Sequence, residues 1–329
     1  MPVSDPVFDT SFQARLLSPR YWLSWLALGL LFVMAFIPVC LRDKLADWLT
    51  PLVLRFSKKQ IYIANTNLDI CFPELSEAER QVILHKSVRI GLKSLLGFGE
   101  FTVRSPAYLM KRIQVSGWHH IEAEQAEGRP VILVVPHSWP VDAAGYYFAQ
   151  RGIEMCTMMK SARNPVFDWH INRERAKSGC RVYERQAGIK PIIKAVKGGR
   201  SFFYLPDQDH GREASIFVPF FGRAKATLPA LPRLVKLTGA KAVPLLACYD
   251  EAQHCYRLEI EAPFADYPSG DLQADTLHMN QMVEGQLRRH PGQYMWFLKI
   301  FETLEHPVDK HGLYEAGIKR IRRGLSPHP

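Results

Sequence analysis

The segment VVPHSWPVD, residues 134–142, places His137 and Asp142 with the spacing H-x4-D directly after an apolar run. At the start of a helix, side chains with this spacing can face each other across one turn. An aspartate that accepts a hydrogen bond from one ring nitrogen fixes the histidine tautomer and leaves the other nitrogen free as a base. Such a base can take a proton from a hydroxyl as that hydroxyl attacks an acyl carbonyl. The competing interpretation is that Asp142 caps the helix and His137 is an incidental loop residue.

A second polar cluster, PDQDHGR at residues 206–212, contains Asp207, Asp209 and His210. These side chains could orient a polar substrate or bind a cation. A turn is the competing interpretation, because proline, aspartate and glycine favour turns whatever the function. The segment alone does not supply the oxygen ligands that a hard cation needs, and we predict no metal site.

Sequence motifs for other cofactors and nucleophiles are missing. P-loop and dinucleotide-binding fingerprints are absent, so we predict no cofactor. The G-x-S-x-G elbow of serine hydrolases is absent as well. The six cysteines form no C-x-x-C pair, which disfavours a zinc site or a disulfide framework and indicates reduced thiols.

The chain is basic. Its 329 residues include 42 Lys and Arg against 32 Asp and Glu, giving a formal net charge of +10. This excess predicts an anionic partner: phosphates, an acidic protein or an anionic membrane face. No motif that reads RNA or DNA is visible, so nucleic acid is not predicted as a partner. Eleven Lys and Arg stand against three acidic residues between residues 160 and 200, where arginine forks could grip phosphate.

Residues 21–41, YWLSWLALGLLFVMAFIPVCL, form an uncharged stretch of 21 residues. At about 1.5 Å per residue, one helix of this length would cross a hydrocarbon core of roughly 30 Å. No cleavage site follows, so we expect an uncleaved anchor. Pro38 leaves the alternative that the segment bends and lies within one leaflet. Because more Lys and Arg follow the stretch than precede it, the large domain is expected on the cytoplasmic side.

Helical and strand patterns organise the rest of the chain. Ser76 and Glu79 form a capping box ahead of apolar residues at helical spacing. From residue 117, short β-rich runs alternate with helices, which predicts an α/β fold with a mostly parallel central sheet flanked by helices. His137 and Asp207 each follow a strand-like run. We therefore expect both at the carboxyl edge of the sheet, where ligands gather in such folds.

The predicted organisation has five segments. A flanking segment covers residues 1–20, the anchor 21–41, a helical membrane-proximal region 42–115, the catalytic α/β domain 116–306 and a basic tail 307–329.

Eight blocks of sequence, in order, resemble the late acyltransferases of lipid A biosynthesis. They are SPRYW, NLDICFPELSEAER, PHSWPVD, NPVFDW, GIKP, YLPDQDHG, KATLPALPRLVK and PGQYMW. The resemblance runs from about residue 12 to about residue 303, essentially the whole chain. The H-x4-D motif is similar to that of the wider glycerolipid acyltransferase superfamily. YLPDQDHG and KATLPA are more similar to the myristoyl-transferring members than to the lauroyl-transferring ones.

The resemblance implies transfer of an acyl group from an acyl carrier protein thioester to a hydroxyl on a Kdo-bearing lipid A precursor. The implied location is the Gram-negative inner membrane, with the catalytic domain facing the cytoplasm. A lauroyl-type enzyme, a phospholipid acyltransferase and a membrane-anchored envelope scaffold are the alternatives.

The resemblance also assigns roles to single residues. His137 would be the general base and Asp142 its orienting partner. Substrate-binding roles carry over to Arg175, Lys190, Asp207 and Asp209. No role is assigned to the intervening Ser-Trp-Pro of residues 138–140.

Overall fold

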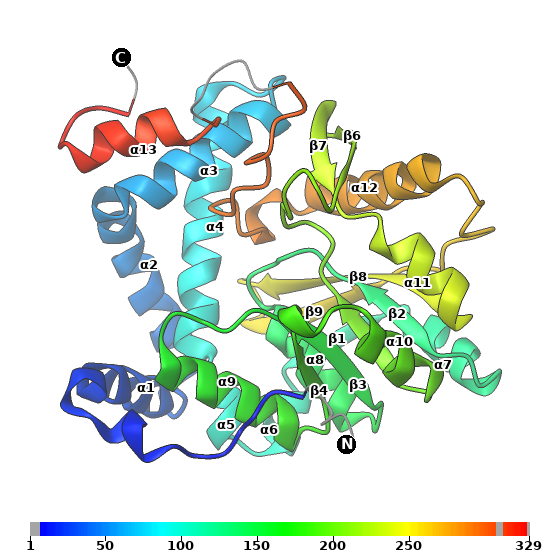
Figure 1. Cartoon of the computed structure of the whole chain (residues 1–329). Helices are drawn as coiled ribbons and strands as arrows, with labels where there is room; N and C mark the ends of the chain where they lie inside the picture. Colours follow the sequence, from blue (N-terminus) through cyan, green and yellow to red (C-terminus); the bar gives the residue numbers. More distant parts are fainter. Residues whose placement is uncertain (1–6, 307–311, 328–329) are drawn as a thin grey trace.

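The computed structural model describes residues 7–306 and 312–327 (Figure 1). Its centre is a seven-stranded sheet with the order β1-β9-β8-β2-β5-β3-β4. Neighbouring strands are parallel, except that β8 and β9 are antiparallel. This arrangement confirms the predicted α/β fold with a mostly parallel sheet. The strands are β1 (Ile113–Ser116), β2 (Val131–Val134), β3 (Met155–Met159), β4 (Arg181–Glu184), β5 (Ser201–Tyr204), β8 (Lys241–Asp250) and β9 (Cys255–Ile260).

Helices cover both faces of the sheet, because successive strand residues point to opposite sides. Val131 and Leu133 of β2 face a core built with α7 and α8, while Ile132 and Val134 face a core built with α10, α11 and α12. All four side chains are buried, as a continuous apolar run predicts for a central parallel strand. These helices are α7 (Trp118–Ala126), α8 (Val141–Gln150), α10 (Lys190–Lys197), α11 (Ala230–Thr238) and α12 (Leu272–Arg289).

A helical layer precedes the sheet in sequence and packs beside it (Figure 1). The longest of its helices, α4, begins at the predicted capping box: the Ser76 hydroxyl accepts from the Glu79 N–H, and the Glu79 carboxylate accepts from the Ser76 N–H. Both α2 and α3 pack on α4. The helices are α2 (Val39–Phe56), α3 (Lys58–Cys71), α4 (Glu77–Gly97), α5 (Glu100–Val103) and α6 (Pro106–Met110).

Two ends of the predicted segments differ from the structure. Strand β1 lies inside the stretch predicted to be helical, because its four residues gain hydrogen-bonding partners only from β9, far along the chain. Helix α13 (Glu315–Arg322) lies in the predicted tail and packs on α3. Residues 307–311 and 328–329 of that tail, and residues 1–6 of the first segment, lie outside the described residues.

The prediction of one spanning helix over residues 21–41 is wrong. Helix α1 (Trp22–Met34) ends after 13 residues, and α2 starts at Val39, with Pro38 in an extended conformation between them. Within the described ranges, every helix is too short or too polar to cross a bilayer. Proline has no N–H to continue a helical hydrogen-bond pattern, so the apolar stretch divides at Pro38. Of the two predicted arrangements of the anchor, the bent one agrees with this backbone.

Two further elements complete the chain. Helix α9 (Pro165–Lys177) is capped by Asn164, whose side chain accepts from two backbone N–H groups. Strands β6 (Ile216–Phe220) and β7 (Arg223–Thr227) form a separate hairpin. Phe220 and Phe221 at its turn are buried in the core of the helical layer.

Candidate active site

The carboxyl ends of β2 and β5 bring His137 and Asp207 together. These strands are parallel neighbours in which Val134 pairs with Tyr204, and each of the two polar residues lies three positions beyond its strand's paired residue. The prediction that both lie at one edge of the sheet is therefore confirmed. His137 Nδ1 is 2.5 Å from Asp207 Oδ1, and the His137 backbone N–H donates to Asp207 Oδ2 at 2.8 Å.

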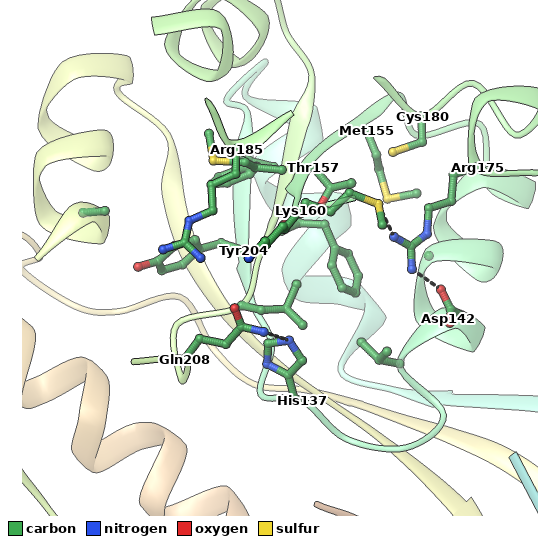
Figure 2. Close-up of a pocket in the computed structure, with 18 of the residues that line it drawn as sticks. His137, Asp142, Met155, Thr157, Lys160, Arg175, Cys180, Arg185, Tyr204 and Gln208 are labelled. Carbon is green, nitrogen blue, oxygen red and sulfur yellow. Dashed lines mark hydrogen bonds and ion pairs between the residues drawn. The ribbon is translucent and has the colours of Figure 1, made fainter. Parts of the chain in front are cut away.

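The contact keeps Asp207 ionised and fixes the tautomer of His137. Burial would raise the pKa of its carboxyl, but the charge and hydrogen bonds of His137 outweigh burial and lower it, with a further contribution from Tyr294. An ionised carboxylate can only accept hydrogen bonds. Nδ1 of His137 therefore carries a proton toward Asp207, which leaves Nε2 as the basic nitrogen. The Gln208 amide nitrogen lies 3.2 Å from that Nε2 (Figure 2).

The predicted orienting partner, Asp142, binds a different residue. Its Oδ1 accepts from Arg175 Nη2 at 2.6 Å, and Figure 2 shows this pair on the opposite side of the view from Gln208. Asp142 lies in the first turn of α8, and its side chain is directed toward α9, which carries Arg175. The structure thus corrects the predicted pairing: Asp207 orients His137, and Asp142 holds Arg175.

Trp139 locks the loop that carries His137 onto α4. Its indole N–H donates to the Ser87 hydroxyl at 3.0 Å, and that hydroxyl donates to the Tyr294 carbonyl at 2.6 Å. Gly91 provides the space, since a Cβ at this position would come within 2.7 Å of the indole ring. This contact gives the central residue of the Ser-Trp-Pro sequence a structural role: it sets the position of the loop that carries His137.

Backbone hydrogen bonds hold the same loop on its other side. The Met295 N–H donates to the His137 carbonyl at 3.0 Å, and the Trp139 N–H donates to the Gln293 carbonyl at 2.9 Å. The segment PGQYMW, residues 291–296, therefore runs beside the histidine loop as a short antiparallel bridge. His137 is fixed through its ring, its N–H and its carbonyl.

A cavity of about 840 Å³ is lined by His137, Asp142 and Arg175. It extends over the carboxyl ends of β3 and β5 and reaches both faces of the sheet. On one face its wall is apolar and comes from Phe101, Tyr146, Met155 and Cys180; on the other it comes from Ile193, Phe202 and Leu234. Polar lining groups include Lys160, Arg185 and Gln208 (Figure 2). A base at the wall of a large, mainly apolar cavity suits chemistry on a substrate with hydrocarbon chains.

Comparison with known proteins identifies the family of the chain. Residues 9–303 match the family described as bacterial lipid A biosynthesis acyltransferase. The chain belongs to this family. It is therefore an acyltransferase of lipid A biosynthesis.

Three relatives show how far the similarity extends. A lipid A biosynthesis acyltransferase of Haemophilus influenzae (strain ATCC 51907 / DSM 11121 / KW20 / Rd) is 37% identical over 302 residues, covering 92% of this chain and 94% of the relative. The lipid A biosynthesis myristoyltransferase of Escherichia coli K12 is 37% identical over 313 residues, covering 94% and 96%. The lipid A biosynthesis lauroyltransferase of the same organism is 32% identical over 295 residues, covering 89% and 95%.

Three of the four residues predicted to bind substrate, Lys190, Asp207 and Asp209, do not line the cavity of this acyltransferase. Asp207 binds the ring and backbone N–H of His137 instead. Asp209 accepts hydrogen bonds from the N–H of Gly211 and from the N–H and hydroxyl of Thr303, so it ties two loops together. Lys190 is exposed at the first position of α10. The structure brings His137, Asp142 and Arg175 to one cavity, with Asp207 directly behind the base.

Sequence reasoning missed two groups close to the pair of His137 and Asp207. Tyr294 is fully buried, and Asp207 helps to raise the pKa of its hydroxyl, after burial itself. Lys225 is buried, and desolvation lowers the pKa of its ammonium to about 8 although Asp207 and Asp209 oppose that shift. Both residues stand in family-like blocks, PGQYMW and KATLPA, but no spacing rule singles them out because their contacts cross the fold.

The side chains of this acyltransferase that could hold a metal ion lie elsewhere. Among the described residues, Cys248, Glu259 and His290 are the one group of three whose donor atoms come within 4.8 Å of one another. None of them lines the cavity. Glu259 and His290 already pair at 3.0 Å.

The first prediction concerns Asp207→Asn. The neutral amide of asparagine cannot stabilise a protonated imidazole as the negative carboxylate does. We therefore expect the transfer rate to fall by about a hundred-fold or more. Steady-state transfer assays with purified protein measure the effect, and thermal unfolding checks that the fold persists. Asp209→Asn, which keeps one acceptor oxygen at a site away from the cavity, is expected to retain most activity. A rate for Asp207→Asn within a few-fold of wild type would contradict the assigned pairing.

The second prediction concerns Gly91→Ala. The added methyl group must displace the Trp139 indole, so we expect a loss of about 1–3 kcal/mol in the free energy of unfolding. We also expect a loss of transfer activity, because the displaced loop carries His137. Urea unfolding and transfer assays measure the two effects. Gly29→Ala on α1 is the matched control, since a Cβ there meets nothing within 4 Å. Equal stability and equal transfer activity of the two variants would show that Trp139 does not need the space at Gly91.

Proposed function

We propose that the chain completes hexa-acyl lipid A by transferring a fatty acyl group of the myristoyl class. The donor would be an acyl carrier protein thioester, and the acceptor a hydroxyl of a hydroxyacyl chain on a Kdo-bearing lipid A precursor. The observation that carries the proposal is the Asp207-held His137 at the wall of a large apolar cavity. The myristoyl assignment is supported by the higher identity to the E. coli myristoyltransferase, 37%, than to the lauroyltransferase, 32%.

The proposed reaction is a direct transfer with both substrates bound. Nε2 of His137 takes the proton of the acceptor hydroxyl as its oxygen forms a bond to the thioester carbonyl carbon. The carbon–sulfur bond then breaks, and the imidazolium returns the proton to the leaving thiolate. Asp207 stabilises the transient imidazolium, since its charge lies against the ring.

Arg175 is the proposed stabiliser of the oxyanion. It lines the same cavity as His137, and Asp142 both holds its position and helps to keep the guanidinium charged against the cost of burial. Fixed positive charge in a largely apolar cavity stabilises a developing oxyanion more strongly than the same charge in water. Backbone N–H groups at the start of α8 could add to this stabilisation.

Cys180 lines the cavity but is a poor candidate for an acyl-enzyme nucleophile. Burial raises the pKa of its thiol to about 11, and the nearby Arg175 only partly opposes that effect. The thiolate is the nucleophilic form of cysteine, so at neutral pH this side chain stays protonated. Direct attack by the acceptor hydroxyl is therefore the proposed route.

We propose that α1 and α2 rest in the cytoplasmic leaflet of the inner membrane. Ten large apolar side chains are exposed there: Trp22, Leu23, Leu26, Leu30, Val33, Phe36, Leu41, Trp48, Leu52 and Phe56. Exposed Arg20, Lys44, Arg55 and Lys58 accompany them. Apolar side chains together with cations are what an interfacial helix needs to enter the boundary of an anionic bilayer. A membrane-bound acceptor would then be presented at the surface that carries these helices.

The third prediction tests the activity itself. Purified protein, a lipid A precursor and acyl carrier proteins loaded with several chain lengths should give transfer, fastest with the myristoyl donor. His137→Ala should remove transfer, and it should also lower the thermal unfolding temperature, because the buried Asp207 carboxylate then lacks the partner that keeps it ionised. Thioester cleavage at full rate without acceptor would indicate a hydrolase instead.

Mass spectrometry of lipid A from a deletion strain gives an independent readout of that prediction. We expect a precursor that lacks one acyl chain. Intact hexa-acyl lipid A in that strain would contradict the proposed function, and altered glycerophospholipids would indicate a phospholipid acyltransferase.

The fourth prediction tests the membrane surface. Leu23 and Leu26 are 76% and 69% exposed on α1, and burying a leucine side chain contributes about 1.5–3 kcal/mol. The double variant Leu23→Ser, Leu26→Ser should therefore bind anionic vesicles at least about ten-fold more weakly in a flotation assay. Val82→Ser removes a similarly exposed side chain from α4 and should leave binding unchanged. Equal binding by the double variant and wild type would exclude α1 as the contact.

A further inference from the structure

Two long stretches of the chain contain cations but no acidic residue. Residues 185–206 include Arg185, Lys190, Lys194, Lys197 and Arg200, with no Asp or Glu. Residues 214–249 include Arg223, Lys225, Arg233, Lys236 and Lys241, again with no Asp or Glu. These stretches supply α10 and α11, which pack side by side on one face of the sheet (Figure 1).

The exposed surface of these two helices is uniformly basic. Lys190, Lys194 and Lys197 recur at helical spacing on the outer side of α10, while Ile192, Ala195 and Val196 face the core. Arg233 and Lys236 are exposed on α11 in the same way. Within residues 7–306 and 312–327, none of these five cations is engaged in a hydrogen bond or an ion pair. Cations that are not neutralised by the protein itself are free to bind an anionic partner.

An apolar opening lies within this basic surface. Ile189, just before α10, is 40% exposed, and Leu237 on α11 is 52% exposed. Both also line the cavity that contains His137, as does Arg233. Because residues that line the cavity are exposed here, the cavity reaches the surface between α10 and α11. Deeper in the same passage lie Ile193 and Leu234.

We propose that this surface docks the acyl carrier protein, and we call it the donor face: Ile189, Lys190, Lys194, Lys197, Arg233, Lys236 and Leu237. The proposal rests on the proposed function, which requires an acidic protein bearing an acyl thioester on a flexible arm. The apolar opening admits the acyl chain and its arm, and the cations surround it and pair with the carboxylates of the partner. Cationic rims of this kind steer the approach of an acidic protein and fix its orientation.

If the carrier protein docks on the donor face, the lipid acceptor must enter the cavity from the opposite side. Helix α1, with its exposed apolar side chains, packs against α9, which carries Arg175. The acceptor therefore reaches the cavity from the α1 and α9 side, and the thioester from the α10 and α11 side. His137 stands where the two substrates meet.

The fifth prediction compares two donors in one variant. Lys194→Glu, Lys197→Glu reverses two charges that lie outside the cavity wall. With acyl carrier protein as donor, we expect KM to rise at least about ten-fold with kcat nearly unchanged. With a neutral small donor carrying the same chain, an N-acetylcysteamine thioester, we expect kcat/KM within two-fold of wild type. Isothermal titration calorimetry should show the same loss of carrier-protein binding.

A variant with the same change in net charge is the matched control. Lys111→Glu, Lys319→Glu alters exposed lysines after α6 and on α13, and it should leave KM for the carrier protein unchanged. An equal rise of KM in this control would overturn the proposal, because net charge alone would explain the effect. Added salt should raise KM for the carrier protein with wild type and leave the neutral donor unaffected.

Other outcomes overturn the donor face directly. Equal losses with both donors would mean that the variant damages the reaction centre, and no loss with either would mean that the carrier protein docks elsewhere. Loss of anionic vesicle binding with an unchanged KM for the carrier protein would make α10 and α11 a membrane contact instead. If wild type bound the carrier protein but transferred nothing to the lipid A precursor, the proposed function would fail while the donor face stood.

Discussion

Asp207 accepts hydrogen bonds from both the ring and the backbone N–H of His137. The rest of the site is arranged around that contact. The two residues meet because β2 and β5 are parallel neighbours in which Val134 pairs with Tyr204. His137 and Asp207 each follow the paired residue by three positions, so both lie at the same edge of the sheet. A carboxylate buried this deeply is held ionised chiefly by the histidine that it orients. The two residues thus depend on each other: Asp207 orients the ring of His137, and His137 keeps the buried carboxylate ionised.

The sequence leads to this edge of the sheet but not to the correct partner. Apolar runs that end before His137 and Asp207 predict two strands, and the α/β alternation predicts that those strands end at one edge. The H-x4-D spacing then points to Asp142 as the partner, although surface neighbours on a helix are three or four residues apart and these two are five apart. His137, however, lies in the loop before α8 rather than on it, and the direction of a loop side chain depends on tertiary contacts that spacing does not contain.

The N-terminal apolar stretch also shows what sequence patterns alone cannot predict. Its length and lack of charge satisfy the rule for a spanning helix, but Pro38 divides it, and α2 continues with buried polar residues such as Arg42 and Asp43. Arg42 pairs with Glu100 at 2.9 Å in the protein interior, and Asp43 accepts from the Tyr249 hydroxyl of β8. The first pair joins two helices of the helical layer, and the second forms only when that layer packs on the sheet. A local hydropathy argument cannot anticipate them, since each partner is far away in sequence.

Helix α4 contacts both the helices α1 and α2, which we propose to lie in the membrane, and the loop that carries His137. The apolar helices α1 and α2 pack against it, and the loop that carries His137 is fixed to it through Trp139. The segment 291–296, which borders that loop on its other side, also packs on α4. His137 is therefore positioned by elements outside the sheet as well as by the strand that precedes it.

The close approach of Trp139 to Gly91 couples two positions that are 48 residues apart in the chain. An indole ring at position 139 leaves no room for a side chain at position 91. Any sequence with this fold that carries a side chain at position 91 must accommodate it with a smaller group at position 139 or with a different path of the histidine loop. Variation at these two positions is thus not independent: helix α4 and the histidine loop can change only together.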